Sequence, residues 1–184
     1  MLINKKKQIL KSKCSQVWIE TVIYTLIGLT IIGILLTTIR PVIEERRDRL
    51  VIEQSVEMLN SLSNEIDELR YYGTGNSRLV ELKVKNGLLK INSPNDSIEF
   101  SLESKHEYSQ IGEEVKIGKI KAMTTKKTKG YNVFLKLDYN SILNLTWNHG
   151  HNEKIFQTAP TPYKIIILNN GTIENLINID FSEG

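Results

Sequence analysis

The chain has 184 residues, 40% of them hydrophobic and 24% charged, which is room for one ordinary domain and one further element. Lysine and arginine outnumber aspartate and glutamate by 24 to 21, but five of the basic residues precede Gln16 and no acidic residue does. The rest of the chain therefore carries 19 basic and 21 acidic side chains, a balance that gives no reason to expect nucleic-acid binding. The single cysteine, Cys14, excludes an intramolecular disulfide.

The first 15 residues form a basic leader, and a long apolar run follows at residues 17–39. These 23 residues contain no lysine, arginine or aspartate. As a helix they would span roughly 35 Å, enough for a hydrocarbon core of about 30 Å. The run is too long for the apolar part of a secretory signal, which is about 7–15 residues. The lysines before it predict a cytoplasmic N-terminus and an exported remainder.

A helical pattern continues beyond the apolar run. Apolar residues recur at spacings of three and four, which predicts one buried stripe on an amphipathic helix: Ile52, Val56, Leu59, Leu62, Ile66 and Leu69. Pro41 predicts a kink or a short melted piece. We therefore expect one helix over residues 16–70, transmembrane at 17–39, which ends in a glycine-containing segment at residues 71–76.

From Arg78 the apolar period changes to two, which is typical of strands. Short alternating runs are separated by turns, and Asn86-Gly87 predicts a hairpin between residues 80–84 and 89–91. Residues 124–130 predict an exposed basic loop. Eight or nine strands over residues 71–184 indicate an α+β chain: a long N-terminal helix followed by a C-terminal antiparallel β-sandwich or β-sheet domain.

Three short motifs in the β domain fit the acceptor pattern for N-glycosylation, namely Asn95, Asn144 and Asn170. Asn170 lies in a predicted hairpin turn and Asn144 in a predicted strand. His149 and His151 lie close together, but no further ligand accompanies them at the spacing of a metal site. No catalytic, nucleotide-binding or cofactor motif is present in the sequence, so we predict neither an enzyme nor a cofactor nor a bound metal.

Glu20 is the one acid in the apolar run. A carboxylate near the middle of a membrane helix costs roughly 2.5–3.5 kcal/mol on insertion, and less near an end. If the chain is cut between Ser15 and Gln16, the new amine of Gln16 lies at the head of the apolar helix. Glu20 of an adjacent copy could pair with it, and a neighbour in the wrong register would leave both charges unpaired.

A second feature of the apolar run favours close packing between helices. Thr30, Gly33 and Thr37 are spaced by three and four residues, which places small side chains on one helix face. Such a face allows two helix backbones to approach each other.

The stretch Lys13-Cys14-Ser15 followed by Gln16-Val17-Trp18-Ile19-Glu20 and an apolar helix resembles the N-terminus of type IV pilins, particularly the archaeal ones. Cys14 and Ser15 stand where the family usually has a basic residue followed by glycine or alanine. The resemblance implies removal of the leader before Gln16 by a prepilin peptidase, and a lollipop-shaped subunit. It also implies an assembly ATPase and a membrane platform protein as partners.

Together these features predict a structural subunit of an archaeal type IV pilus-like filament. It would be a membrane-inserted precursor that assembles with copies of itself into a surface filament through its N-terminal helix. The alternative is a singly anchored cell-surface β domain that acts as a monomeric adhesin or ligand-binding module, with its leader intact and no role for Glu20.

Overall fold

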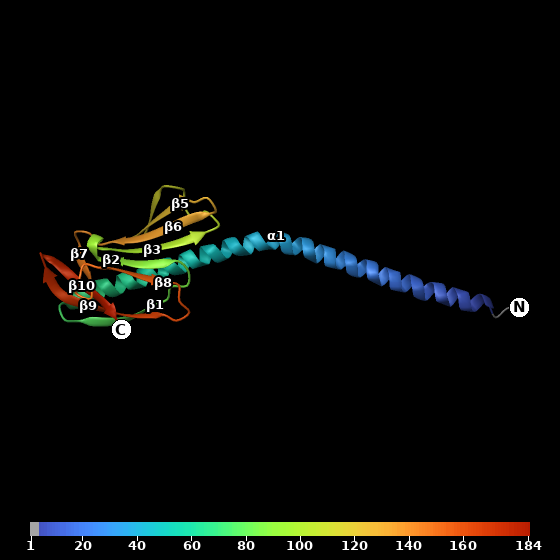
Figure 1. The fold of residues 1–184 in the computed structure, drawn as a ribbon, viewed down its shortest axis with the longest axis horizontal. Coiled ribbons are helices and arrows are strands. Elements are labelled where there is room, and N and C mark those ends of the chain that lie inside the picture. Colours follow the sequence, from blue (N-terminus) through green and yellow to red (C-terminus); the bar gives the residue numbers. More distant parts are fainter. Residues whose placement is uncertain (1–3) are drawn as a thin grey trace. The chain divides into compact units, whose positions relative to one another are not determined.

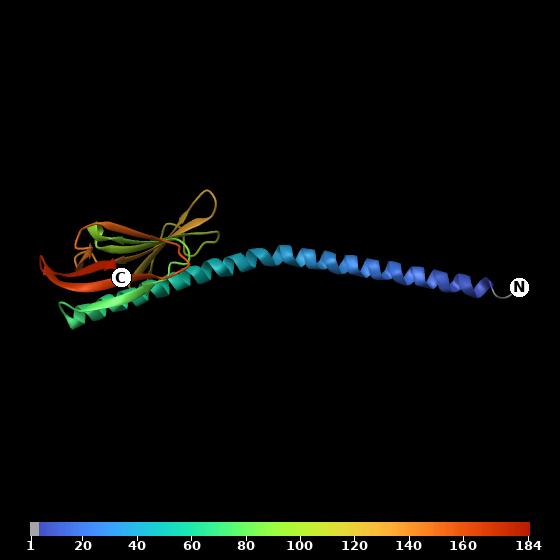
Figure 2. The ribbon, with the colours of Figure 1, turned by 60° about the horizontal axis from the view of Figure 1, so that its bottom comes forward.

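The computed structural model describes residues 4–184, with side chains described from Val17 onward. The chain divides into two compact units, Met1–Glu44 and Glu45–Gly184. The first contains only helix in its described part, and the second, which we call the β unit, contains the rest of that helix and all ten strands of the described residues. Figures 1 and 2 show the elements in two views. The predicted α+β class is confirmed.

Helix α1 runs from Asn4 to Tyr72 and is longer at both ends than predicted. It continues through Pro41, so the melted piece predicted there is absent from the structure. Proline removes one backbone donor and crowds the carbonyl four residues earlier, at a cost of about 3 kcal/mol in a helix interior. The segment is helical in spite of this cost and of the β-branched residues on both sides of Pro41.

The C-terminal end of α1 is held by a glycine and by a distant strand. Gly73 has a left-handed backbone (φ +86°), and its N–H donates to the Leu69 carbonyl over 3.2 Å. The side-chain amide of Asn169 donates to the same carbonyl over 3.0 Å. Both bonds satisfy a carbonyl that the last turn of a helix would otherwise leave without a partner. The predicted stop at residues 71–76 is thereby confirmed.

The predicted apolar stripe of α1 is the centre of the core of the β unit. Five of its six members are at most 1% exposed, namely Ile52, Leu59, Leu62, Ile66 and Leu69, and Val56 is partly buried beside them. They form one cluster with the inward-facing residues of two sheets. Burial of each such side chain contributes about 1.5–3 kcal/mol to folding.

The smaller sheet has four strands in the order β1-β9-β10-β7. Its strands are β1 (Ser77–Leu82), β7 (Leu143–Trp147), β9 (Tyr163–Ile173) and β10 (Leu176–Glu183). β1 pairs with β9 and β9 with β10 in antiparallel fashion, whereas β10 and β7 run parallel. The sheet is therefore mixed. Two parallel neighbours need a connection that returns the chain to the same end of the sheet, and β8 and β9 lie in the connection from β7 to β10.

The larger sheet has six antiparallel strands in the order β4-β5-β6-β3-β2-β8. They are β2 (Leu88–Asn92), β3 (Ser97–Ser104), β4 (Glu114–Ile117), β5 (Ile120–Lys126), β6 (Tyr131–Asp138) and β8 (Glu153–Gln157). A short 3₁₀ helix, η1 (Ser93–Asn95), joins β2 to β3. In β6 buried and partly exposed residues alternate, as expected for a sheet with one face on the core.

The hairpin predicted at Asn86-Gly87 is wrong, because β1 pairs with β9 and β2 pairs with β3 and β8. The chain instead crosses from one sheet to the other at this point. Gly87 has φ +90°, and a Cβ built on it would lie 2.4 Å from the Ser101 carbonyl oxygen. The glycine thus serves a close backbone approach to β3, a requirement that the sequence pattern cannot distinguish from a turn.

The basic loop predicted at residues 124–130 begins later than expected. β5 extends to Lys126, and Thr124 is fully buried with its Oγ1 2.7 Å from the Ser109 hydroxyl. The exposed turn lies between Lys127, whose N–H donates to the Gly130 carbonyl over 3.0 Å, and the start of β6. The sequence pattern does not reveal the end of the strand, because after Ile120 its core-facing residues are the small Ala122 and the polar Thr124.

We predict that Gly87→Ala lowers the free energy of unfolding by about 3 kcal/mol or more, because it combines a left-handed backbone with a steric clash. Gly112→Ala is the matched control, since Gly112 has φ +78° but open space around a Cβ. The control should lose about 1–2 kcal/mol, from backbone strain alone. Denaturant unfolding of the full chain in detergent measures both variants, and equal losses would contradict the close approach at Gly87.

Tyr139 generates a prediction about pH. Burial raises the pKa of its hydroxyl from 10.0 to about 12, and the hydroxyl donates to Ser63 Oγ over 3.1 Å. The folded pKa exceeds the unfolded one, so this contribution is complete below pH 10 and is lost as the pH rises toward 12. Two pKa units correspond to about 3 kcal/mol. We expect the unfolding midpoint to fall over this window in the wild type and to fall less in Tyr139→Phe, as measured by denaturant titration.

Candidate functional site

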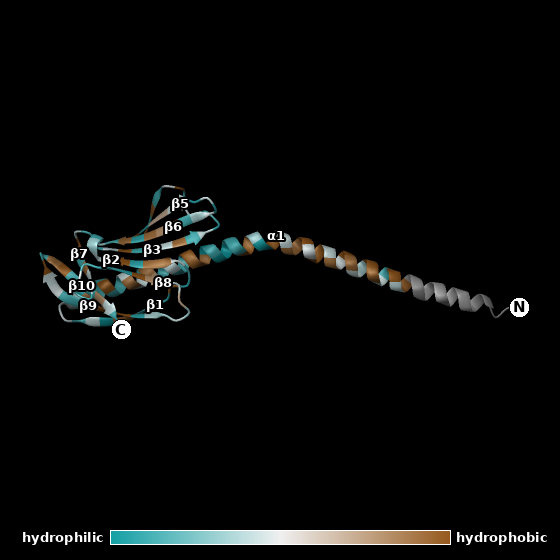
Figure 3. Cartoon of the chain, viewed as in Figure 1, coloured by the Kyte–Doolittle hydropathy of each residue, from teal (hydrophilic) through white to brown (hydrophobic). Residues whose placement is uncertain are grey.

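The described part of the first unit, residues 17–44, exposes its apolar side chains on every side. All of its large apolar side chains are exposed, with Trp18 at 71%, Leu29 at 65% and Ile34 at 60%. Figure 3 shows the apolar stretch as a nearly continuous band along α1. One helix of the described residues is long and apolar enough to cross a membrane. So much exposed apolar surface is unfavourable in water, and the helix requires lipid or other apolar chains around it.

The threonine hydroxyls of this segment are already paired within the helix. The hydroxyls of Thr21, Thr30 and Thr37 donate to the carbonyls of Val17 (2.9 Å), Leu26 (2.7 Å) and Ile34 (2.7 Å). Thr25 and Thr38 bond to backbone carbonyls in the same way. A threonine that bonds back to its own helix presents no unpaired donor to hydrocarbon. The threonines of the segment are therefore as compatible with hydrocarbon as its apolar side chains are.

The predicted packing face of Thr30, Gly33 and Thr37 is exposed on the helix. A Cβ built on Gly33 has no neighbour within 4 Å. Since the two threonine hydroxyls are directed to backbone carbonyls, the face has a low profile with no unpaired polar atom. Nothing in the described part of the chain occupies it, so it remains available to another helix.

Glu20 is exposed near the start of the described side chains. None of the side chains described in residues 17–184 forms a hydrogen bond or ion pair with its carboxylate. Its predicted counterpart is the amine of Gln16 on another copy. The backbones of Ser15 and Gln16 lie in α1, but their side chains lie outside the described residues. Within the described part of the molecule, Glu20 is a charged group that lacks a partner.

The three sequons occupy different environments in the β unit. Asn95 is exposed in η1, and Asn144 in β7 is 9% exposed. Asn170 is exposed, but it lies within β9 and not in a hairpin turn. The turn is formed by Glu174 and Asn175, both with positive φ. Of the three amides, that of Asn144 is enclosed by the folded domain.

Asn170 and Gly171 together form an irregularity in the β9–β10 pairing. Thr172 pairs with Ile177 and Asn169 with Ile179, so two residues of β9 face the single residue Asn178. This is a β-bulge, and it turns Asn170 toward solvent. The Asn-Gly signal therefore marks a bulge here, as it marks a crossing between sheets at Gly87.

A polar network that the sequence analysis did not single out lies at the end of β7 and β10. Asp180 is 3% exposed and accepts hydrogen bonds from the Thr146 hydroxyl (2.6 Å) and the His149 N–H (2.8 Å). The His149 Nδ1 lies 3.3 Å from the other carboxylate oxygen of Asp180. No group of three or more histidine, cysteine or acidic side chains that could hold a metal occurs among the described residues. In the sequence of β10 the polar residues Asn178, Asp180 and Ser182 alternate with apolar ones, and this alternation indicates one polar face on the strand.

Comparison with protein-family models, with curated proteins and with solved structures finds no match to this chain. The case for its function therefore rests on its own residues and geometry.

Proposed function

We propose that the chain is a structural subunit of an archaeal type IV pilus-like surface filament. The observation that carries this proposal is the apolar helix, which is exposed on every side and bears one acid, Glu20, that lacks a partner in the described structure. The β unit, which has its own core, would form the outer surface of the filament.

The first step is a membrane-inserted precursor. The apolar run of α1 is compatible with membrane insertion in its length and in the pairing of its threonine hydroxyls. Before assembly, lipid would cover the exposed side chains of residues 17–39. The basic leader would hold the N-terminus on the cytoplasmic side, where a prepilin peptidase would remove residues 1–15.

The second step is the exchange of lipid for copies of the same helix. An apolar helix loses no hydrophobic stabilisation when it moves from lipid into a bundle of apolar helices. Its low-profile face at Thr30, Gly33 and Thr37 would allow close contact. Apolar contact alone does not fix the position of one helix along another, so the register needs a polar pair.

Glu20 would supply that polar pair with the Gln16 amine of a neighbouring copy. In the correct register both charges are neutralised within an apolar surround. In any other register two charges are buried without partners, at a cost of several kcal/mol. An assembly ATPase and a membrane platform protein are the further partners that the resemblance implies. The alternative of a monomeric anchored adhesin leaves Glu20 without this role.

We predict that Glu20→Ala leaves the protein inserted in the membrane but lowers the filament yield at least about tenfold, since 1.4 kcal/mol already corresponds to that factor. The matched control moves the acid by one position, in the double variant Glu20→Ala, Thr21→Glu. It restores the charge but turns it by about 100° around the helix, so it should not restore filaments. Membrane fractionation and electron microscopy of cells that express each variant measure the two properties. Normal filament yield from Glu20→Ala would refute the docking role.

We also predict that the protein recovered from the cell surface begins at Gln16. Intact-mass measurement should give the mass of residues 16–184, with any glycan as a separate increment. The uncut precursor in cells that lack the peptidase is the reference. A surface form that still carries residues 1–15 would favour the monomeric anchored alternative.

A further inference from the structure

Two strands of the β unit have an outer edge without a strand partner among the described residues and remain open to a further strand. β1 is one end of the smaller sheet, and β4 is one end of the larger sheet. At the other ends, β7 is buried along its whole length, and both charged residues of β8 are ion-paired within the unit. An open edge presents a row of backbone donors and acceptors to any strand that can lie beside it.

Alternate residues of β1 direct their backbone groups to its free edge. The Asn169 N–H donates to the Asn76 carbonyl over 3.0 Å, just before β1 begins. Because the bonding residues alternate along an antiparallel ladder, Val80 also bonds to β9. The N–H and C=O groups of Leu79 and Glu81 therefore point away from β9, toward the free edge.

A hollow of about 310 Å³ lies between β1 and α1. Val51 and Met58 line it from the helix, and Val80 lines it from β1. All three side chains pack on the core of the β unit but are only partly buried. A strand added beside β1 would cover them, as happens when an extended segment joins the edge of a sheet.

β4 presents an edge of the same kind. The two-residue turn at 118–119 joins it to β5, and Ile117 pairs with the first residue of that strand. The hydrogen bond that closes such a turn directs the backbone groups of Ile117 to β5, so those of Lys116 point to the free edge. On the inner face of β4, Val115 is 41% exposed and Ile117 is only partly buried.

Antiparallel pairing of β1 with β4 of a second copy places opposite charges together in one register. In this register Glu81 lies opposite Lys116 of the second copy. Lys83, which follows β1 directly, then lies opposite Glu114. A shift of two residues in one direction sets Glu81 against Glu114, and the same shift in the other direction sets Lys83 against Lys116. Like charges directly opposite each other destabilise a sheet, so the charges select one register.

The same register brings apolar side chains together on the inner face. Val80 lies opposite Ile117 of the second copy, above the hollow beside α1. Leu82 lies opposite Val115. A shift by one residue would turn these apolar side chains to the opposite face of the joined sheet. The pattern of both strands thus agrees with the pattern of their charges.

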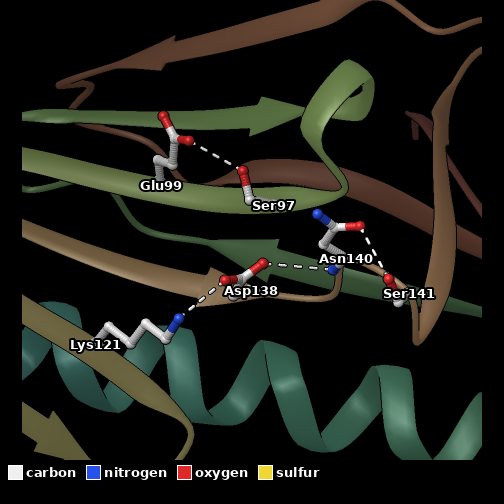
Figure 4. A network of polar contacts seen from close by, with 6 residues as sticks. All are labelled: Ser97, Glu99, Lys121, Asp138, Asn140 and Ser141. Carbon is white, nitrogen blue, oxygen red and sulfur yellow. Dashed lines mark hydrogen bonds and ion pairs between the residues drawn. The ribbon is translucent and has the colours of Figure 1, made fainter.

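The surroundings of Lys116 and Glu81 leave room for this pair. Both residues are exposed. Lys121 lies opposite Lys116 on the inner side, and Figure 4 shows Lys121 held by Asp138, with 3.0 Å between Nζ and the carboxylate. The outer side of Lys116 faces solvent, where a carboxylate from a second copy can approach. Figures 1 and 2 show β1 and the β5 end of the larger sheet on opposite sides of the β unit, so one copy cannot pair its own two edges.

We propose that β1 of one copy pairs with β4 of the next copy, antiparallel and with Glu81 opposite Lys116. The contact joins two different surfaces, so it repeats from copy to copy and builds an open chain. Pairing of one edge with itself would close at a dimer and leave the other edge without a partner. The inference rests on the proposed function, in which the N-terminal helices bring the β units of neighbouring copies together.

Disulfide trapping in intact cells tests the register. The variant Glu81→Cys, Lys116→Cys is made in a Cys14→Ser background, so that the leader contributes no thiol. Directly opposite residues have Cα atoms about 4.5–5.5 Å apart, within the range that a disulfide spans. We expect mild oxidation to give a ladder of dimers, trimers and larger species on a non-reducing gel.

The matched control is Glu81→Cys, Glu114→Cys in the same background. Position 114 is exposed on the same strand, but it lies two residues out of register, at a diagonal separation of about 7–8 Å. Cysteines more than about 7 Å apart are not bridged without backbone movement, so we expect monomer. An equal ladder from the control, no ladder from the first variant, or dimers without larger species overturns the proposal.

This outcome is separable from that of the proposed function. Trapping acts on copies in the membrane and in filaments alike, and electron microscopy of the same cells reports filaments independently. Filaments without a ladder overturn the strand pairing and leave the filament proposal standing. A ladder without filaments supports the strand pairing and contradicts the filament proposal.

Charge reversal provides a second test, with thiols placed instead at Lys83 and Glu114. Glu81→Lys or Lys116→Glu alone sets like charges opposite each other and should lower the trapped fraction by up to about fivefold. The two reversals combined restore opposite charges and should restore the trapped fraction. No loss from the single reversals, or no recovery in the combination, overturns the assigned register.

Discussion

The apolar surface of residues 17–43 cannot remain in water, and the design of the whole chain depends on this constraint. The same helix, α1, meets it in two ways along its length. In the first unit its apolar side chains are exposed all round and its threonines bond to their own backbone. In the β unit its apolar side chains form one stripe, and the unit itself covers them. One element thus requires an external apolar environment over one part and creates an internal one over the other.

This division separates the requirements on the two units. The described surface of the first unit suits an apolar environment, because its hydroxyls bond to their own backbone. A single charge such as Glu20 is costly in such an environment. The β unit is held by its core alone, without a disulfide, and tolerates polar groups where partners exist. Asp180 with Thr146 and His149 is such a case, and so is the Asn169 amide at the end of the helix. Three buried polar atoms among the described residues have no hydrogen-bond partner, namely the Arg70 Nε, the Asn92 Oδ1 and the Ser93 Oγ.

Periodicity in the sequence predicts the elements of this fold but not their partners. The stripe from Ile52 to Leu69, the stop at Gly73 and most strands follow from spacing and glycine alone, because these are local effects. Asn86-Gly87 and Asn170-Gly171 carry the same local signal as a hairpin, yet one is a crossing between sheets and the other a bulge. The parallel pairing of β7 with β10 and the burial of Thr124 depend on contacts distant in sequence. For the same reason the sequence indicates Glu20, which stands out within its own segment, but not the network around Asp180, whose partners lie about 30 positions away in the chain.

The hydrogen bond from the Asn169 amide to the Leu69 carbonyl also bears on the order in which parts of the domain can fold. It joins residues 100 positions apart, and β1 finds its only strand partner in β9, some 86 positions later. During synthesis β1 and β7 therefore lack their strand partners in the smaller sheet until residues 163–183 emerge. The larger sheet needs only residues 88–157 and can form earlier. The smaller sheet is therefore the last part of the domain to form. Until it forms, the unpaired edges of β1 and β7 leave the chain open to proteases and to aggregation.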